Sequence, residues 1–172
     1  MTDEGPSCSV WLLPTPDSST YLQERIRALS VRFSAPMFAP HLTLIGNVPL
    51  SGDAVAASLA QFPPCRRLAL PVEAAGHSAR RFESLFIRLR PVPDLLRLRT
   101  EVASAVGVDL PTEYRPHVSV LYPETGLDER TRRALCSELI GSVPTLLEFG
   151  RLCAVEPVGP NRWEDVSLWR VL

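Results

Sequence analysis

The chain has 172 residues, of which 45% are hydrophobic, and a net charge of −1 at pH 7. This length is enough for one sizeable hydrophobic core, and the balanced charge gives no reason to expect a polyanionic partner. No apolar run reaches membrane-spanning length and the acidic N-terminus lacks the layout of a secretory signal, so we expect a cytoplasmic protein that does not associate with membranes.

Alternating hydrophobic residues predict strands, and hydrophobic residues three or four apart predict helices. The expected elements, in chain order, are a strand over 7–13, a helix over 17–33, a strand at His41, a helix over 51–62, strands over 68–75 and 82–90, a helix over about 93–106, a strand at His117, a helix over 127–140, and strands over 146–155 and 163–171. The order helix, histidine strand, helix, strand, strand therefore occurs twice. This repeat predicts an α+β fold built as a duplicated unit with pseudo-twofold symmetry. We expect one bilobal domain, with halves of about 7–90 and 91–172.

Each half contains a segment with the pattern proline, histidine, aliphatic, hydroxyl, aliphatic. The two segments are Pro40-His41-Leu42-Thr43-Leu44 and Pro116-His117-Val118-Ser119-Val120. Successive side chains on a strand point to opposite faces, so His41 and Thr43 share one face, as do His117 and Ser119. If the equivalent strands meet at the symmetry axis, two imidazoles and two hydroxyls line one groove. Such a groove suits phosphate ester chemistry, because the imidazoles can act as general base and general acid while the hydroxyls hold phosphate oxygens.

These motifs resemble the paired H-x-[ST]-x signature of the 2H phosphoesterase superfamily, and their surroundings are most similar to the plant and fungal cyclic phosphodiesterases. The flanking segments that carry the resemblance are 9–14, 33–41, 116–122 and 163–166. The resemblance implies antiparallel sheets around a central groove with helices outside. It also implies hydrolysis of nucleoside 2′,3′-cyclic phosphates to 2′-phosphates and of ADP-ribose 1″,2″-cyclic phosphate to ADP-ribose 1″-phosphate.

We therefore interpret the chain as a cyclic phosphodiesterase with His41 and His117 as catalytic residues and with Thr43 and Ser119 binding phosphate. Its expected partner is a small cyclic phosphate nucleotide, with no obligate protein partner. One alternative is an enzyme of RNA 3′ ends, of the kind once described as 2′-5′ RNA ligases. Another is a non-catalytic nucleotide-binding module.

Three aromatic residues are further candidates for substrate binding. Tyr122 follows the second motif, and the end of its strand before Pro123 can turn it into the groove; alone, it is as readily a packing residue. Trp11 and Phe82 can stack on a base or fill the core.

We expect no metal and no cofactor, because the histidines come with hydroxyls and no D-x-H, H-x-H or H-E-x-x-H is present. All 18 basic residues are arginine, but they are scattered without a long basic stretch. A mononucleoside cyclic phosphate should therefore be turned over about as well as an oligonucleotide with the same end.

Overall fold

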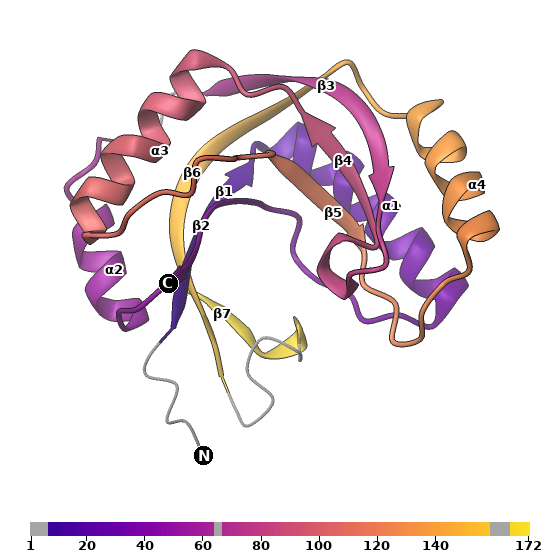
Figure 1. Ribbon diagram of the computed structural model, residues 1–172, viewed down its shortest axis with the longest axis horizontal. Coiled ribbons are helices and arrows are strands. Elements are labelled where there is room, and N and C mark those ends of the chain that lie inside the picture. Colours follow the sequence, from indigo (N-terminus) through magenta and orange to yellow (C-terminus); the bar gives the residue numbers. More distant parts are fainter. Residues whose placement is uncertain (1–6, 64–66, 159–165) are drawn as a thin grey trace.

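The computed structural model describes residues 7–63, 67–158 and 166–172 (Figure 1). Its elements, in chain order, are β1 (Cys8–Pro14), α1 (Pro16–Phe33), β2 (Leu42–Val48), α2 (Gly52–Leu59), β3 (Leu68–His77), a 3₁₀ turn (Arg81–Glu83), β4 (Leu85–Leu89), α3 (Pro93–Val106), β5 (His117–Leu121), α4 (Glu129–Ile140), β6 (Leu146–Pro157), a second 3₁₀ turn (Val166–Leu168) and β7 (Trp169–Val171). The predicted α+β class and the repeated element order are confirmed. No helix in the described part of the chain is long and apolar enough to cross a membrane.

Local side-chain chemistry sets several helix ends. The Ser51 hydroxyl accepts a hydrogen bond from the Ala54 amide at the start of α2, and the Asp128 carboxylate accepts one from the Thr131 amide at the start of α4. Helix α3 ends at Gly107, whose φ of 68° lies in the left-handed region that glycine adopts without strain. The capped helices α2 and α4 are those that follow the histidine strands β2 and β5, and Gly107 ends the helix that precedes β5.

The strands form one antiparallel sheet in the order β2-β1-β6-β3-β4-β5, with β7 paired to β6. Strands β6 and β3 pair at the centre, where Leu70 lies opposite Leu147. Outward from this pair, β1 and β4 occupy equivalent places, and so do β2 and β5. The equivalent strands that meet at the axis are therefore β3 and β6. The expectation that the two histidine strands meet there is wrong, because they lie at opposite ends of the sheet.

Curvature of the sheet brings these two ends together. The strands arch from β6 over β3 to β4, with α2 and α3 outside on one side and α4 outside on the other (Figure 1). Strand β2 approaches β5 across the arch. Helix α1 of the first half packs against β5, and α3 of the second half packs against β2. Each histidine strand is thus supported by a helix from the other half.

The core lies behind the histidine strands. Leu42, Leu44, Val118 and Val120 are at most 1% exposed, as the alternating pattern predicts. The histidines and hydroxyl residues consequently face the concave side. Trp11 also faces this side, where it packs with residues of β6 and not with the main core.

Phe82 does not lie in a strand, contrary to the prediction of a strand over 82–90. It lies in the 3₁₀ turn before β4, which begins at Leu85. The hydroxyl of Ser78 donates to the Glu83 carbonyl and accepts from the Arg80 amide. These local side-chain to backbone bonds compete with strand pairing and hold the turn.

The last strand is shorter than predicted. Strand β7 begins at Trp169, because its partner β6 ends at Pro157, which lies opposite it. Residues 163–165 of the predicted strand, including Trp163, lie outside the described residues.

Candidate active site

His41 and His117 occupy equivalent positions with equivalent hydrogen bonds. The Nδ1 atom of His41 lies 2.7 Å from the carbonyl oxygen of Ala39, and that of His117 lies 2.9 Å from the carbonyl oxygen of Arg115. A carbonyl can only accept, so Nδ1 carries the proton in both neutral rings. Nε2 is therefore the nitrogen left for proton transfer in each ring.

Each histidine lies beside an aromatic ring from the neighbouring strand. The Trp11 ring of β1 stacks on His41 with a centroid distance of 3.5 Å and an interplanar angle of 5°. The Phe86 ring of β4 lies 5.2 Å from His117 at 57°. The parallel stack covers one whole face of His41, whereas the tilted ring leaves His117 more open.

The two imidazoles differ in burial, and for His41 burial changes the pKa. His41 is 6% exposed, whereas His117 is partly exposed. Burial lowers the pKa of His41 to about 4, and repulsion from His117 adds to this, while the bond to the Ala39 carbonyl acts in the opposite direction. His41 is therefore neutral at pH 7 and can accept a proton.

The two motif hydroxyls are not equivalent. The Ser119 hydroxyl donates to the Phe82 carbonyl at 2.8 Å, whereas the Thr43 hydroxyl makes no hydrogen bond to another described residue. The Tyr122 hydroxyl is hydrogen-bonded with the Ser119 side chain, and burial raises the pKa of Tyr122, so this phenol stays protonated. Thr43 is thus the hydroxyl with a proton not yet engaged.

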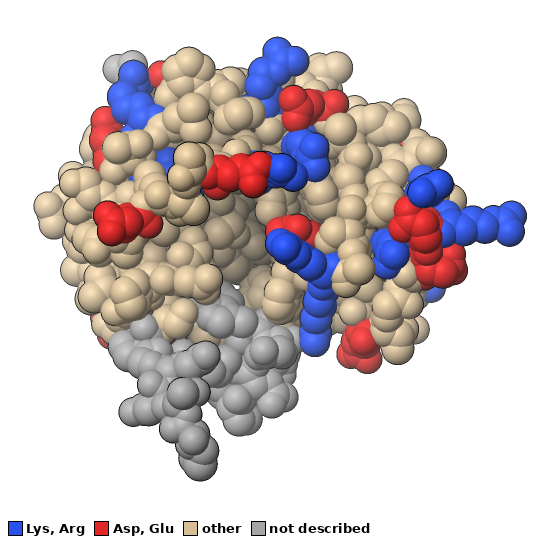
Figure 2. Space-filling model, viewed as in Figure 1, with Lys and Arg blue, Asp and Glu red and all other residues tan. Residues whose placement is uncertain are grey.

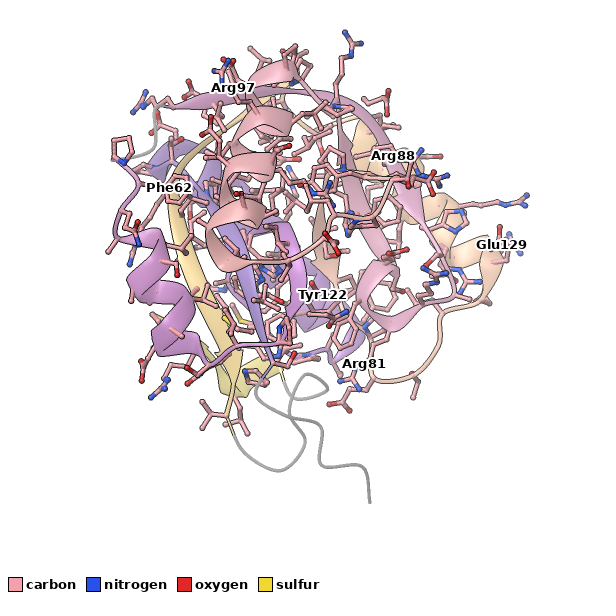
Figure 3. The ribbon with its side chains drawn as sticks, turned by 60° about the vertical axis from the view of Figure 1, so that its left-hand side comes forward. Phe62, Arg81, Arg88, Arg97, Tyr122 and Glu129 are labelled. Atoms are coloured by element: carbon pink, nitrogen blue, oxygen red, sulfur yellow. The ribbon has the colours of Figure 1, made fainter. Side chains whose placement is uncertain are left out.

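The predicted site residues come together around one cavity of about 420 Å³. A hollow is visible between the two halves on this face (Figure 2). All seven side chains singled out from the sequence line the cavity: His41, Thr43, His117, Ser119, Tyr122, Trp11 and Phe82. Strand β5 ends at Leu121, which allows Tyr122 to turn toward the interior between the halves (Figure 3).

Sequence reasoning missed two aromatic residues of this site. Trp169 lines the cavity, and its ring lies 5.8 Å from that of His41 and 5.9 Å from that of Tyr122. Phe38 stacks on Tyr122 with a centroid distance of 4.0 Å. Phe38 lies three residues before His41, and this closeness in the sequence could have indicated that it belongs to the site. Trp169 gives no such indication, because only the curved sheet brings it to the cavity.

Asn47, Glu83 and Ser9 also line the cavity. Asn47 has a φ of 54°, a left-handed conformation that asparagine tolerates better than most residues. Within the described ranges, no group of three or more His, Cys, Asp or Glu side chains converges so that it could hold a metal ion.

Comparison with known proteins adds a family and a fold. Residues 7–145 match the family described as "Cyclic phosphodiesterase-like protein". The Arabidopsis thaliana protein named "Cyclic phosphodiesterase" is 24% identical over 123 residues, which are 71% of this chain and 68% of that protein.

Solved structures share the fold at low sequence identity. LigT from E. coli complexed with 3′-AMP superposes with a TM-score of 0.54 and 16% identity, covering 98% of this chain and 94% of that chain. LigT from E. coli complexed with NADP+ superposes with a TM-score of 0.54 and 14% identity, and covers the same shares of the two chains. A structure described as a phosphoesterase gives 0.53 and 16%, covering 97% and 95%. The α+β arrangement with its curved antiparallel sheet is thus that of the LigT-like phosphoesterases.

Proposed function

Because the chain belongs to the cyclic phosphodiesterase-like family of 2H phosphoesterases, which hydrolyse cyclic phosphodiesters, we propose that its substrates are ribose cyclic phosphates opened by a two-histidine mechanism. The observation that carries the mechanism is the matched pair of Nδ1–carbonyl bonds at His41 and His117. These bonds orient both rings and leave both Nε2 atoms for chemistry at one cavity.

In the proposed reaction His41 is the general base and His117 the general acid. Neutral His41 takes a proton from a water molecule as the water oxygen bonds to phosphorus. Protonated His117, whose partly exposed ring keeps contact with water, gives a proton to the ribose oxygen as its bond to phosphorus breaks. One water is consumed, the ring opens, and the two imidazoles end with exchanged protonation states.

Hydroxyl groups bind the non-bridging phosphate oxygens in this proposal. Thr43 can donate directly, because its hydroxyl has no other partner among the described residues. Ser119 must first give up its bond to the Phe82 carbonyl, and the adjacent Tyr122 phenol offers another O–H donor. Such donors stabilise charge that develops in the transition state, and each contributes on the order of 10²–10³ in rate where its geometry is ideal.

The aromatic cluster around the cavity supports a nucleotide substrate. Trp11, Phe82 and Trp169 offer apolar faces beside the polar groups, a combination typical of small-molecule sites. The cavity volume of about 420 Å³ lies in the range of such sites. We expect metal-independent catalysis, because imidazoles and hydroxyls alone supply each proton and hydrogen bond required.

The test is turnover of adenosine 2′,3′-cyclic phosphate by the purified protein, with products separated by chromatography. We expect adenosine 2′-phosphate, and in ¹⁸O-labelled water one labelled oxygen in the product phosphate. No turnover would refute the proposed function. Release of adenosine 3′-phosphate instead would contradict the expectation, taken from the family resemblance, that the 3′ oxygen of the ribose is the leaving group.

A further inference from the structure

A second cavity of about 480 Å³ adjoins the first and shares Thr43, Glu83 and His117 with it. Arginines that are far apart in the sequence line this second cavity. They are Arg80, Arg88, Arg99 and Arg115. Basic side chains gather at the rim of the hollow between the halves (Figure 2). The fold therefore concentrates positive charge that the sequence leaves scattered.

Only part of this charge is neutralised. The two acidic residues of the wall, Glu83 and Glu113, each form an ion pair with one of the two exposed arginines at the rim. Arg88 and Arg99 have no carboxylate partner within 4.0 Å among the described residues. Two guanidinium groups thus face the cavity without a counter-charge.

Arg99 is held in place by its surroundings. It is 7% exposed, its Nε donates to the Leu44 carbonyl at 3.1 Å, and its guanidinium lies over the Tyr114 ring at 4.1 Å. The Tyr114 hydroxyl in turn donates to the Thr43 carbonyl at 3.1 Å. A buried cation without a counter-charge is costly, and a bound anion would offset that cost.

Arg88 lies next to the proposed general acid. It is opposite His117 in the register of β4 and β5, so the two side chains leave the same face of the sheet. Its guanidinium carbon is 5.8 Å from the centre of the Phe86 ring, which itself lies beside His117. An anion bound by Arg88 would be adjacent to the phosphate that reacts.

The fold itself does not require these charges. Leu13 follows Trp11 by two residues in β1, as Arg88 follows Phe86 in β4. Helices α1 and α3 both begin at a proline, and counted from Pro16 and Pro93 the position of Arg99 corresponds to the buried Leu22 in α1. The pseudo-symmetric positions are uncharged, so the paired arginines serve one side of the groove only.

We propose that this cavity is a second phosphate site, in which Arg88 and Arg99 bind a phosphate group of the substrate other than the one that is hydrolysed. The inference rests on the proposed function and narrows its substrate class. The preferred substrate is a ribose cyclic phosphate that carries a further phosphate, either a 5′-phosphate or the phosphodiester of an RNA end. This differs from the expectation, drawn from the scattered arginines, that a mononucleoside cyclic phosphate suffices.

The test compares kcat/KM for three substrates at roughly 50 and 200 mM salt. They are adenosine 2′,3′-cyclic phosphate, its 5′-phosphorylated form, and diadenosine monophosphate with a 2′,3′-cyclic phosphate end. We expect the second phosphate to raise kcat/KM about tenfold at the lower salt, through charge-assisted hydrogen bonds, and much less at the higher salt. If only the 5′-phosphorylated nucleotide has a raised kcat/KM, the substrates are free nucleotides. If the dinucleotide has an equally raised kcat/KM, the substrates include RNA ends.

Substitution assigns the site. Arg88→Gln should bring the ratio of kcat/KM between the 5′-phosphorylated and unphosphorylated substrates to about one. The matched control is Arg97→Gln, which removes the same charge from the exposed surface of α3, where Arg97 pairs with Asp94 (Figure 3). The control should keep the wild-type ratio. The second variant is Arg99→Lys, which keeps the positive charge but loses the planar guanidinium that can donate two parallel hydrogen bonds to a phosphate. It should lower this ratio of kcat/KM only partly.

Equal kcat/KM for all three substrates would overturn the second site, and so would a preference that survives in Arg88→Gln. If no substrate is turned over, the proposed function fails instead. Binding of adenosine 2′,5′-bisphosphate and adenosine 2′-phosphate, measured by calorimetry, then decides the second site alone. Tighter binding of the bisphosphate that disappears in Arg88→Gln supports the site, and equal binding contradicts it.

Discussion

Replacing Trp11 with alanine should raise the pKa of His41. The Trp11 ring covers one face of His41 at 3.5 Å in a nearly parallel stack, and burial is the main reason why the pKa of His41 is about 4 instead of 6.5. Removing the ring readmits water to that face and so stabilises the charged imidazolium. Because Trp169 and Phe38 still contact the ring by their edges, we expect a partial return, by at least about one pH unit.

The expected effect on activity follows from the fraction of neutral His41. At pH 5 a pKa of about 4 leaves roughly nine tenths of the base neutral, a pKa of about 5 leaves half, and a pKa of 6.5 leaves about 3%. The acid limb of kcat/KM should therefore lie below pH 5 in the wild type and move upward in Trp11→Ala. NMR titration of the His41 ring protons measures the same pKa directly.

Phe86→Ala is the matched control, since Phe86 occupies the equivalent place beside His117. It should leave the pKa of His41 near its wild-type value. Circular dichroism checks that both variants stay folded. A wild-type His41 that titrates near 6.5, or a pKa that does not move in Trp11→Ala, would refute the claim that burial beneath Trp11 keeps the base neutral.

Three further predictions concern stability, the hydroxyls and metals. Between pH 6.5 and 4 the unfolded chain protonates His41 while the folded chain does not, so the free energy of unfolding should fall by up to about 3 kcal/mol as pH drops through this window. Urea titrations of the wild type and of His41→Gln measure this fall, and an equal fall in both proteins would contradict the prediction. Thr43→Val should lower kcat by about 10²-fold and Ser119→Ala by about tenfold, because Ser119 must break its bond to the Phe82 carbonyl before it can donate to phosphate; the reverse order in steady-state kinetics would refute this reasoning. Exhaustive EDTA treatment should leave turnover unchanged, and a loss restored by zinc or magnesium would show that a metal takes part.

The element order and the shared polar face of the two histidine motifs could be predicted because they depend on local patterns. The duplicated proline–histidine frames place His41 and His117 on strands whose aliphatic neighbours must be buried, and strand alternation then fixes which side chains share the polar face. Helix α3 has the predicted bounds, since Pro93 and Gly107 mark its ends.

What the sequence could not predict depends on long-range geometry. The histidine strands lie at opposite ends of the sheet and meet only because the sheet curls, which no local pattern encodes. The same curvature brings Trp169 to His41. It also gathers Arg88 and Arg99 at one cavity, although they come from a strand and a helix. The turn that holds Phe82 is the exception, because it is local: hydrogen bonds of the single residue Ser78 hold it, and the alternating pattern of 82–90 gives no sign of them.

The most direct test of the two-histidine mechanism is the kcat/KM of His41→Gln, His117→Gln and the double variant with adenosine 2′,3′-cyclic phosphate. Each single change should cost on the order of 10²-fold or more, the scale of a lost general acid or base. The double variant should cost far less than the product of the two, because the pair acts as a unit. Near-normal kcat/KM in either folded single variant would contradict the mechanism.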